Sequence, residues 1–111
     1  MPANTSVPAQ GLRQQRAAQL RAEMDVKQRA VAHVALDANN TLSLRVAAFG
    51  ALAESARNNG NMLEESQIDT LVKIAREESD LVIRTSSSQA LGAVNIATNK
   101  AGEIIRGYYG G

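Results

Sequence analysis

Few residues of this chain belong to the types that perform catalysis or bind metals. The sequence contains one histidine, His33, and no cysteine. A Cys–His or Ser–His nucleophile–base pair and a zinc site of Cys and His ligands therefore lack the side chains that they need. Phosphate-binding loops, dinucleotide fingerprints and HExxH motifs are absent as well. His33 falls beside the apolar stripe of a helix, so we interpret it as a surface or boundary residue rather than a ligand or a base.

The remaining reactive side chains form short runs at or inside helices. The serines at 86–88 lie in mid-helix. There we expect their hydroxyls to donate hydrogen bonds to carbonyls of the same helix, where two helices cross closely; a phosphorylation or hydroxyl cluster is the alternative. The acidic pairs Glu64-Glu65 and Glu77-Glu78 consist of sequence neighbours, whose side chains diverge around a helix and make poor acid–base pairs. We therefore expect a protein that is not an enzyme and that uses no cofactor and no metal.

Basic side chains concentrate near the N-terminus. Residues 1–29 contain five basic and two acidic side chains, in a chain whose net charge is +1. So mild an excess is typical of a solvated helix face, and the aromatic side chains on which single-stranded nucleic acid stacks are almost absent. Nucleic-acid binding is therefore an alternative function that we rank below protein binding. Its candidate contact patch is Arg13, Arg16, Arg21, Lys27 and Arg29.

The composition indicates that helices must position these residues. Apolar residues make up 44% of the 111 residues, yet only three are aromatic. A core of Ala, Leu, Val and Ile without rings suits close-packed helices better than a sandwich or a barrel. Both prolines fall within the first eight residues, so the rest of the chain is free to be helical. We predict an all-α domain at 11–107, after a disordered lead-in at 1–10 and before a flexible tail at 108–111.

Periodicity and capping signals divide this domain into helices. Apolar residues at helical spacing mark each buried stripe, and turn residues such as Gly60 separate the stripes. Asp25 begins a capping box, so residues 11–38 form either one helix or two. Gly50 lies in mid-helix, which predicts a close helix crossing. The further helices are expected at about 42–58, from between 61 and 66 to about 76, at about 81–95 and, as a short cap, at about 99–106.

The chain repeats itself with a shift of 39 residues, which aligns Leu42 with Leu81 and Arg45 with Arg84. A helix–turn–helix repeat near this period is typical of an α-solenoid, in which each repeat packs on its neighbours. The repeated positions are therefore expected to pack each helix against its partner helices. The core of the second hairpin is expected to be less well packed, because a serine stands there in place of Phe49. The repeated positions are Leu42, Leu44, Arg45 and Leu52 in the first copy and Leu81, Ile83, Arg84 and Leu91 in the second.

The pairs Leu44-Arg45 and Ile83-Arg84, followed by Ala51-Leu52 and Ala90-Leu91-Gly92, resemble the second helix of the HEAT-repeat family, which has Val-Arg at this position. The resemblance covers roughly residues 27–95. It implies a short right-handed α-solenoid of two HEAT-like helical hairpins, with an N-terminal helix and a short C-terminal capping helix. Repeat 1 would span about 26–58, repeat 2 about 64–95 and the cap about 99–106.

In the HEAT family an acidic residue six places before this Arg commonly joins a ladder between repeats. Glu78 has that spacing before Arg84, whereas Asn39 stands at the same place before Arg45. The resemblance thus implies a ladder in the second repeat and leaves the first repeat without its acidic member.

HEAT arrays usually serve as scaffolds or adaptors. The resemblance therefore implies a non-enzymatic protein–protein interaction or scaffold module. It would bind a protein partner or a second copy of itself, and one version of this hypothesis makes the chain a fragment or terminal part of a larger protein. Nucleic-acid binding through the basic helix is the alternative, and an accessory subunit of an enzyme is the third hypothesis. No signal peptide or membrane-spanning run is visible and Cys is absent, so the cytoplasm is the default expectation and no membrane partner is expected.

Overall fold

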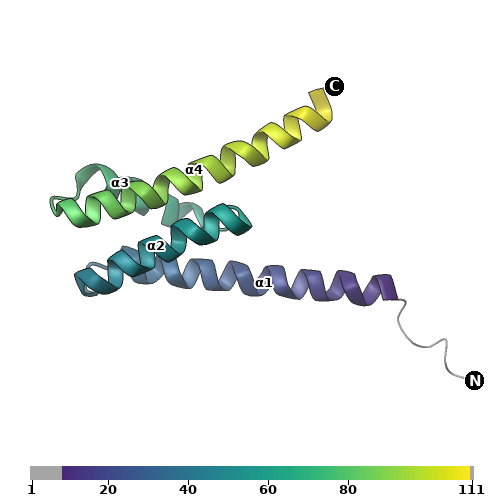
Figure 1. Ribbon diagram of the computed structural model, residues 1–111, viewed down its shortest axis with the longest axis horizontal. Helices are drawn as coiled ribbons and strands as arrows, with labels where there is room; N and C mark the ends of the chain where they lie inside the picture. Colours follow the sequence, from purple (N-terminus) through teal and green to yellow (C-terminus); the bar gives the residue numbers. More distant parts are fainter. Residues whose placement is uncertain (1–8, 111) are drawn as a thin grey trace, which may run out of the picture.

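The computed structural model describes residues 9–110, with side chains described for residues 13–99. All regular structure in this part of the chain is helical, which confirms the predicted all-α class (Figure 1). The predicted lead-in falls mostly on residues 1–8, which lie outside the described residues, as does Gly111. The helices are α1 (Ala9–Leu36), α2 (Leu42–Asn59), α3 (Glu65–Glu77) and α4 (Leu81–Gly110).

Polar residues at the predicted turns begin and end these helices. The Thr41 hydroxyl accepts a hydrogen bond from the Leu44 backbone N–H at 3.3 Å and caps α2. The Asp80 carboxylate caps α4 by accepting from the N–H groups of Val82 and Ile83. Gly60 ends α2 with a φ of 87°, a backbone angle that glycine adopts without the strain of a Cβ. Each cap satisfies helix-end groups that would otherwise lack a partner.

α1 is one continuous helix, so Asp25 does not begin a second one. From Leu12 onward its residues are mostly Gln, Arg, Ala, Leu, Lys and Val, without proline or glycine, and nothing interrupts the hydrogen-bond ladder. Asp25 is half-buried in the middle of the helix. The capping-box pattern at 25–28 is therefore a sequence coincidence within a longer helix.

α4 is longer than predicted. The sequence suggests an end near Asn95, a separate cap at 99–106 and a flexible tail from 108, but the helix runs unbroken to Gly110. Asn and Thr cost a helix at most about 0.7 kcal/mol each, too little to end one without a proline or a glycine cap. Thr98 also donates its hydroxyl back to the Val94 carbonyl at 2.9 Å, a bond compatible with a continuous helix. The last part of α4 thus extends away from α2 instead of covering the stack (Figure 1).

The helices form two antiparallel hairpins, α1–α2 and α3–α4, which lie side by side (Figure 1). α2 and α4 run parallel and make the largest helix–helix contact, while α1 and α3 touch over a smaller area. The molecule measures 68 × 39 × 19 Å, and its radius of gyration is 18.2 Å. A compact domain of this length would have a radius of about 13 Å. The outer parts of α1 and α4, which extend past the end of α2, account for the elongated shape.

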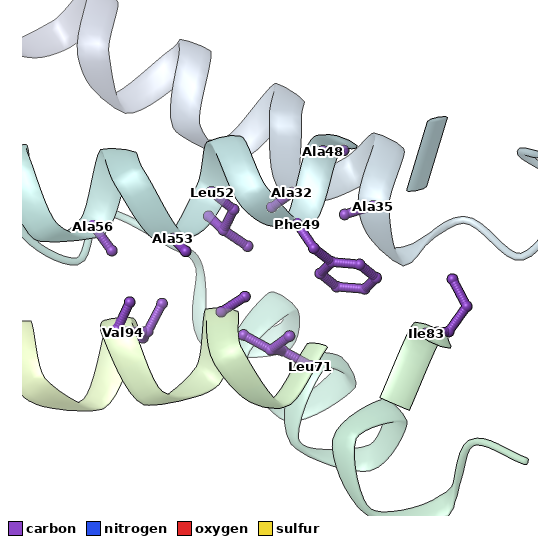
Figure 2. Packing of buried hydrophobic residues seen from close by; sticks show 12 residues of the cluster. Ala32, Ala35, Ala48, Phe49, Leu52, Ala53, Ala56, Leu71, Ile83 and Val94 are labelled. Carbon is purple, nitrogen blue, oxygen red and sulfur yellow. The ribbon is translucent and has the colours of Figure 1, made fainter. Parts of the chain in front are cut away.

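The core lies between α2 and its neighbours. Phe49 and Leu52 on α2, Leu71 on α3 and Val94 on α4 are almost fully buried. Figure 2 shows Phe49, Ala53 and Ala56 on the side of α2 that faces α4, with Leu71 close by. Seven of the twelve core residues among the described side chains are alanines, which allow the helix backbones to approach closely. The twelve are Ala32, Ala35, Ala48, Phe49, Leu52, Ala53, Ala56, Leu71, Ile83, Ala90, Ala93 and Val94.

Only some of the repeated apolar positions are buried between helices, so the prediction that all of them pack against partner helices is wrong in part. Leu52 and Ile83 are buried and Leu91 is half-buried. Leu42, Leu44 and Leu81 are instead 46%, 48% and 64% exposed. Leu42 and Leu81 are the first residues of their helices, before the first complete turn. The counterpart of Leu44, Ile83, faces the preceding hairpin (Figure 2), whereas the described residues place no hairpin before α1–α2, so Leu44 has none to face.

Ser88 of the second copy stands on a face that no described helix covers. With the 39-residue shift, Phe49 and Ala56 correspond to Ser88 and Asn95. The first two are buried under α4, whereas Ser88 and Asn95 are exposed on the outward side of α4. The expectation that loss of a phenylalanine leaves the second hairpin poorly filled is therefore wrong. The same helix position is apolar where a neighbouring hairpin covers it and polar where water does.

Gly50 does not mark a close helix crossing, contrary to the prediction. A Cβ atom added to Gly50 or to Gly92 would have no neighbouring atom within 4 Å. Both glycines instead lie along an open groove of about 640 Å³ between α2 and α4. The groove also contacts Val46, Phe49, Ala53, Arg57, Ser86, Gln89, Ala93 and Ile96.

Because these helical glycines face open space, replacing them with alanine should stabilise the fold. We expect Gly50→Ala and Gly92→Ala each to raise the free energy of unfolding by about 0.4–1 kcal/mol, since alanine loses less backbone entropy on folding. Urea denaturation followed by circular dichroism measures the change. Gly60→Ala is the control and should be destabilising, because φ at Gly60 is 87°. A loss of stability in Gly50→Ala would restore the close-crossing interpretation.

Candidate interaction surface

The described side chains contain no cluster of three or more His, Cys, Asp or Glu residues able to hold a metal ion. His33 is exposed, as predicted, in a shallow depression beside Ser66, Gln67 and Thr70. Of the serines at 86–88, only Ser87 behaves as predicted: it is fully buried and donates its hydroxyl to the Arg84 carbonyl at 3.0 Å. Ser86 is half-buried and Ser88 is exposed. Ser87 thus contributes packing and a hydrogen bond within its own helix.

Gln28 is the central polar residue of the fold. Its side chain is 1% exposed and reaches from α1 into the connection between the two hairpins. Its amide nitrogen donates to the Ser55 hydroxyl at 2.9 Å and to the Gly60 carbonyl at 3.0 Å. Its amide oxygen accepts from the Met62 backbone N–H at 2.7 Å. One side chain thus joins α1, α2 and the segment that leads to α3.

Neighbouring residues bind the same connection from both sides. Arg29 donates from Nε to the Met62 carbonyl at 2.8 Å, and Gln67 donates to the Arg29 carbonyl at 3.0 Å. Toward the second hairpin, Asn61 donates its amide to the Thr98 hydroxyl at 3.1 Å. Every buried side-chain nitrogen and oxygen among the described residues has a hydrogen-bond partner. No signal in the sequence identifies Gln28, because a single glutamine in a helix is an ordinary surface residue unless its partners are known.

Arg45 and Arg84 occupy the same repeat position but differ in role. Arg45 is buried and donates from Nε to the Ala35 carbonyl at 2.9 Å, near the C-terminal end of α1. The last carbonyls of a helix lack internal partners, and a cation there also complements the helix dipole. In the second hairpin the corresponding carbonyl, that of Ile74, already accepts from the Glu78 backbone N–H at 3.1 Å. Arg84 accordingly remains exposed.

The residue that the resemblance places in a ladder with Arg84 makes a local contact. The carboxylate of Glu78 accepts a hydrogen bond from the Asp80 backbone N–H at 3.1 Å. At the matching place in the first hairpin, the Asn39 backbone N–H donates to the Asp37 carboxylate at 2.9 Å. Both side-chain contacts stabilise the turns between paired helices.

The predicted basic patch lies on α1, and its members are all exposed. Arg13, Arg16 and Arg21 lie on the outer half of the helix, and Lys27 follows where the hairpin packing begins. Arg29 is separate from them, because its side chain bonds to the α2–α3 connection. On this half of α1 the side chains of residues 13–24 are exposed without exception, so they form a free helical surface.

Exposed apolar side chains occur on this same half and at the start of α2 and α4. Leu20 and Met24 lie on α1, close to Asn59 at the end of α2 and to Met62 in the connection that follows. Leu42 and Leu44 begin α2, and the fourth helix starts with two more exposed apolar residues. These are the surfaces on which a partner could remove apolar area from water.

Comparison of the chain with protein-family models, curated proteins and solved structures finds no match. Among the described residues, each helix is too short or too polar to cross a bilayer.

Replacing Gln28 should weaken the whole fold. We expect Gln28→Ala to lower the free energy of unfolding by about 2–3 kcal/mol, because the Met62 N–H and the Gly60 carbonyl would lose their buried partner. Gln89→Ala is the matched control: Gln89 is exposed on α4, and its replacement should change stability by less than about 0.5 kcal/mol. Equal effects of the two substitutions in urea denaturation would show that the Gln28 bonds contribute nothing.

The two repeat arginines give a second matched pair. Arg45→Ala should lower the free energy of unfolding by about 1.5–3 kcal/mol, the usual loss for a hydrogen bond to a charged group, since it leaves the Ala35 carbonyl without this donor. Arg84→Ala should cost less than about 0.5 kcal/mol because Arg84 is exposed. Thermal unfolding of both variants decides the point, and a larger loss in Arg84→Ala would contradict the assigned roles.

Proposed function

We propose that the chain is a non-enzymatic protein-interaction module, built as a short HEAT-like α-solenoid of two stacked helical hairpins. The observation that supports the solenoid most directly is the exchange of Phe49 for Ser88. One repeat position is buried where the next hairpin covers it and polar on the outward face of the last described hairpin. Such a pattern is what stacked repeats with a polar terminal face require.

The partner in this proposal is another protein. A stack of helices offers long, rigid surfaces, and this chain leaves apolar side chains exposed on them, Leu20, Met24 and Leu44 among them. Polar groups in the interior are satisfied within the chain, so the described residues leave no buried polar side-chain atom waiting for a substrate. Recognition of a protein surface uses the features that are present: apolar side chains surrounded by charges.

Chemical crosslinking of the full chain tests this proposal in the cells that express it. Lys27 on α1 and Lys73 on α3 are both exposed and are suitable attachment points for an amine-reactive crosslinker. We expect reproducible crosslinks from at least one of them to one or a few defined proteins. Leu71→Asp is the control, because a charge at this fully buried position unfolds the stack and should abolish those crosslinks.

Two results would contradict the proposal. One is a set of crosslinked proteins that is the same for the wild-type chain and for Leu71→Asp, since binding would then not depend on the fold. The other is a purified chain that binds no protein and converts a substrate at a measurable rate.

A further inference from the structure

The outer half of α1 is a helix without a partner among the described residues. The side chains of residues 13–24 are all exposed, and Leu20 and Met24 are 54% and 38% exposed. A helical segment of about 12–15 residues is only marginally stable in water when nothing packs against it. A second helix packed along this half would therefore both bury its apolar side chains and stabilise it.

The exposed apolar residues continue the face that packs in the core. Ala17, Leu20 and Met24 follow one another at helical spacings of three or four residues, and the same spacing leads on to Val31 and Ala35. Val31 and Ala35 belong to the core or pack against it. α2 covers this face only as far as its own last residue, Asn59, whereas the face continues along α1 toward the N-terminus.

A recess marks the place where the cover ends. It has a volume of about 490 Å³ and lies between the outer half of α1 and the end of α2. Leu20 and Met24 line it on the α1 side, and Asn59 and Met62 line it on the other side. Met62 is held there by its backbone bonds to Gln28 and Arg29, so the recess is bounded by an ordered connection.

Cations outnumber carboxylates along this apolar stripe. Arg16 precedes Leu20 by four residues, and Arg21 and Lys27 stand three residues on either side of Met24, so these cations share or border the same face. With Arg13, residues 13–27 contain four cations and two carboxylates. An apolar stripe with cations along it is complementary to an apolar stripe flanked by carboxylates.

We propose that the α1 face, defined as Ala17, Leu20 and Met24 with Arg13, Arg16, Arg21 and Lys27, binds an amphipathic helix of a partner protein whose apolar stripe is flanked by Asp and Glu. The proposal rests on the proposed function and names the chemistry of the partner. The bound helix lies along α1 beyond the end of α2, with its apolar side chains in the recess and its carboxylates beside the cations.

Two other occupants fit this face less well. Nucleic acid would use the cations but would leave Leu20 and Met24 beside phosphates, and the face has no aromatic side chain on which a base could stack. A second copy of the chain would need a free acidic amphipathic helix. The acidic helix among the described elements is α3, whose central Leu71 is already buried in the core.

Binding of two synthetic peptides to the full chain tests the proposal. The first is an 18-residue amphipathic helix (a length of about 27 Å at 1.5 Å per residue) with leucines on one face and glutamates beside them. The second has lysine in place of every glutamate. By fluorescence anisotropy at low salt, the acidic peptide should bind and the basic peptide should bind at least about tenfold more weakly. Binding of the acidic peptide should also weaken as salt rises.

Matched variants locate the binding site. Leu20→Gln and Met24→Gln keep a good helix former and should each weaken binding by about tenfold, because the apolar contact is lost. Val26→Gln is the control: Val26 is 66% exposed on another face of the same helix, and its replacement should leave binding unchanged. Arg21→Glu should weaken binding, while Arg76→Glu, which alters an exposed cation on α3, should not.

Three binding results would overturn this inference: no binding of the acidic peptide, equal binding of both peptides, or equal effects of Leu20→Gln and Val26→Gln. A fourth is a dimer, seen by light scattering, that Leu20→Gln dissociates. Tighter binding of single-stranded RNA, unaffected by Leu20→Gln, would assign the face to nucleic acid instead. If only the peptide result fails and crosslinks to a protein remain, the interaction module stands and its binding face lies elsewhere.

Discussion

The connection between the two hairpins is held against α1 by the side-chain amide of Gln28. Its oxygen and nitrogen bind two backbone groups within the α2–α3 connection, the Met62 N–H and the Gly60 carbonyl. The connection contains Gly60 at a positive φ and no helical bonds of its own, so side chains such as those of Gln28, Arg29 and Asn61 satisfy its backbone groups. Together with the Gln67–Arg29 and Asn61–Thr98 hydrogen bonds, this contact ties the second hairpin to the first.

The same fixation relates the stack to its proposed binding face. Gln28 lies on the side of α1 that faces the core, and the exposed residues Leu20 and Met24 continue that side toward the N-terminus. The core half of α1 is anchored by the hydrogen bonds of Gln28, so the proposed binding face lies next to the anchored part of the same helix.

Sequence reasoning predicts the helices of this chain well and its surfaces less well. Local signals such as Thr41, Gly60 and Asp80 place the helix ends correctly, because each acts on its own backbone. The exposure of Leu44 and Ser88 depends on whether a hairpin lies on the other side, and no local pattern contains that information. The predicted α4 is too short because Asn95 weakens a helix without ending it. Gln28 could not be found at all, since its three partners lie 27–34 residues away in sequence.

Hydrogen exchange of the Met62 backbone N–H tests the role of Gln28 most directly. If the Gln28 oxygen holds this amide in the folded state, the Met62 N–H should exchange only when the whole stack unfolds, with the same opening free energy as the core amides of α2. Exchange of the Met62 N–H at the rate of a freely exposed loop, while α2 remains protected, would show that the connection opens independently. That result would contradict the conclusion that Gln28 holds the connection between the two hairpins against α1.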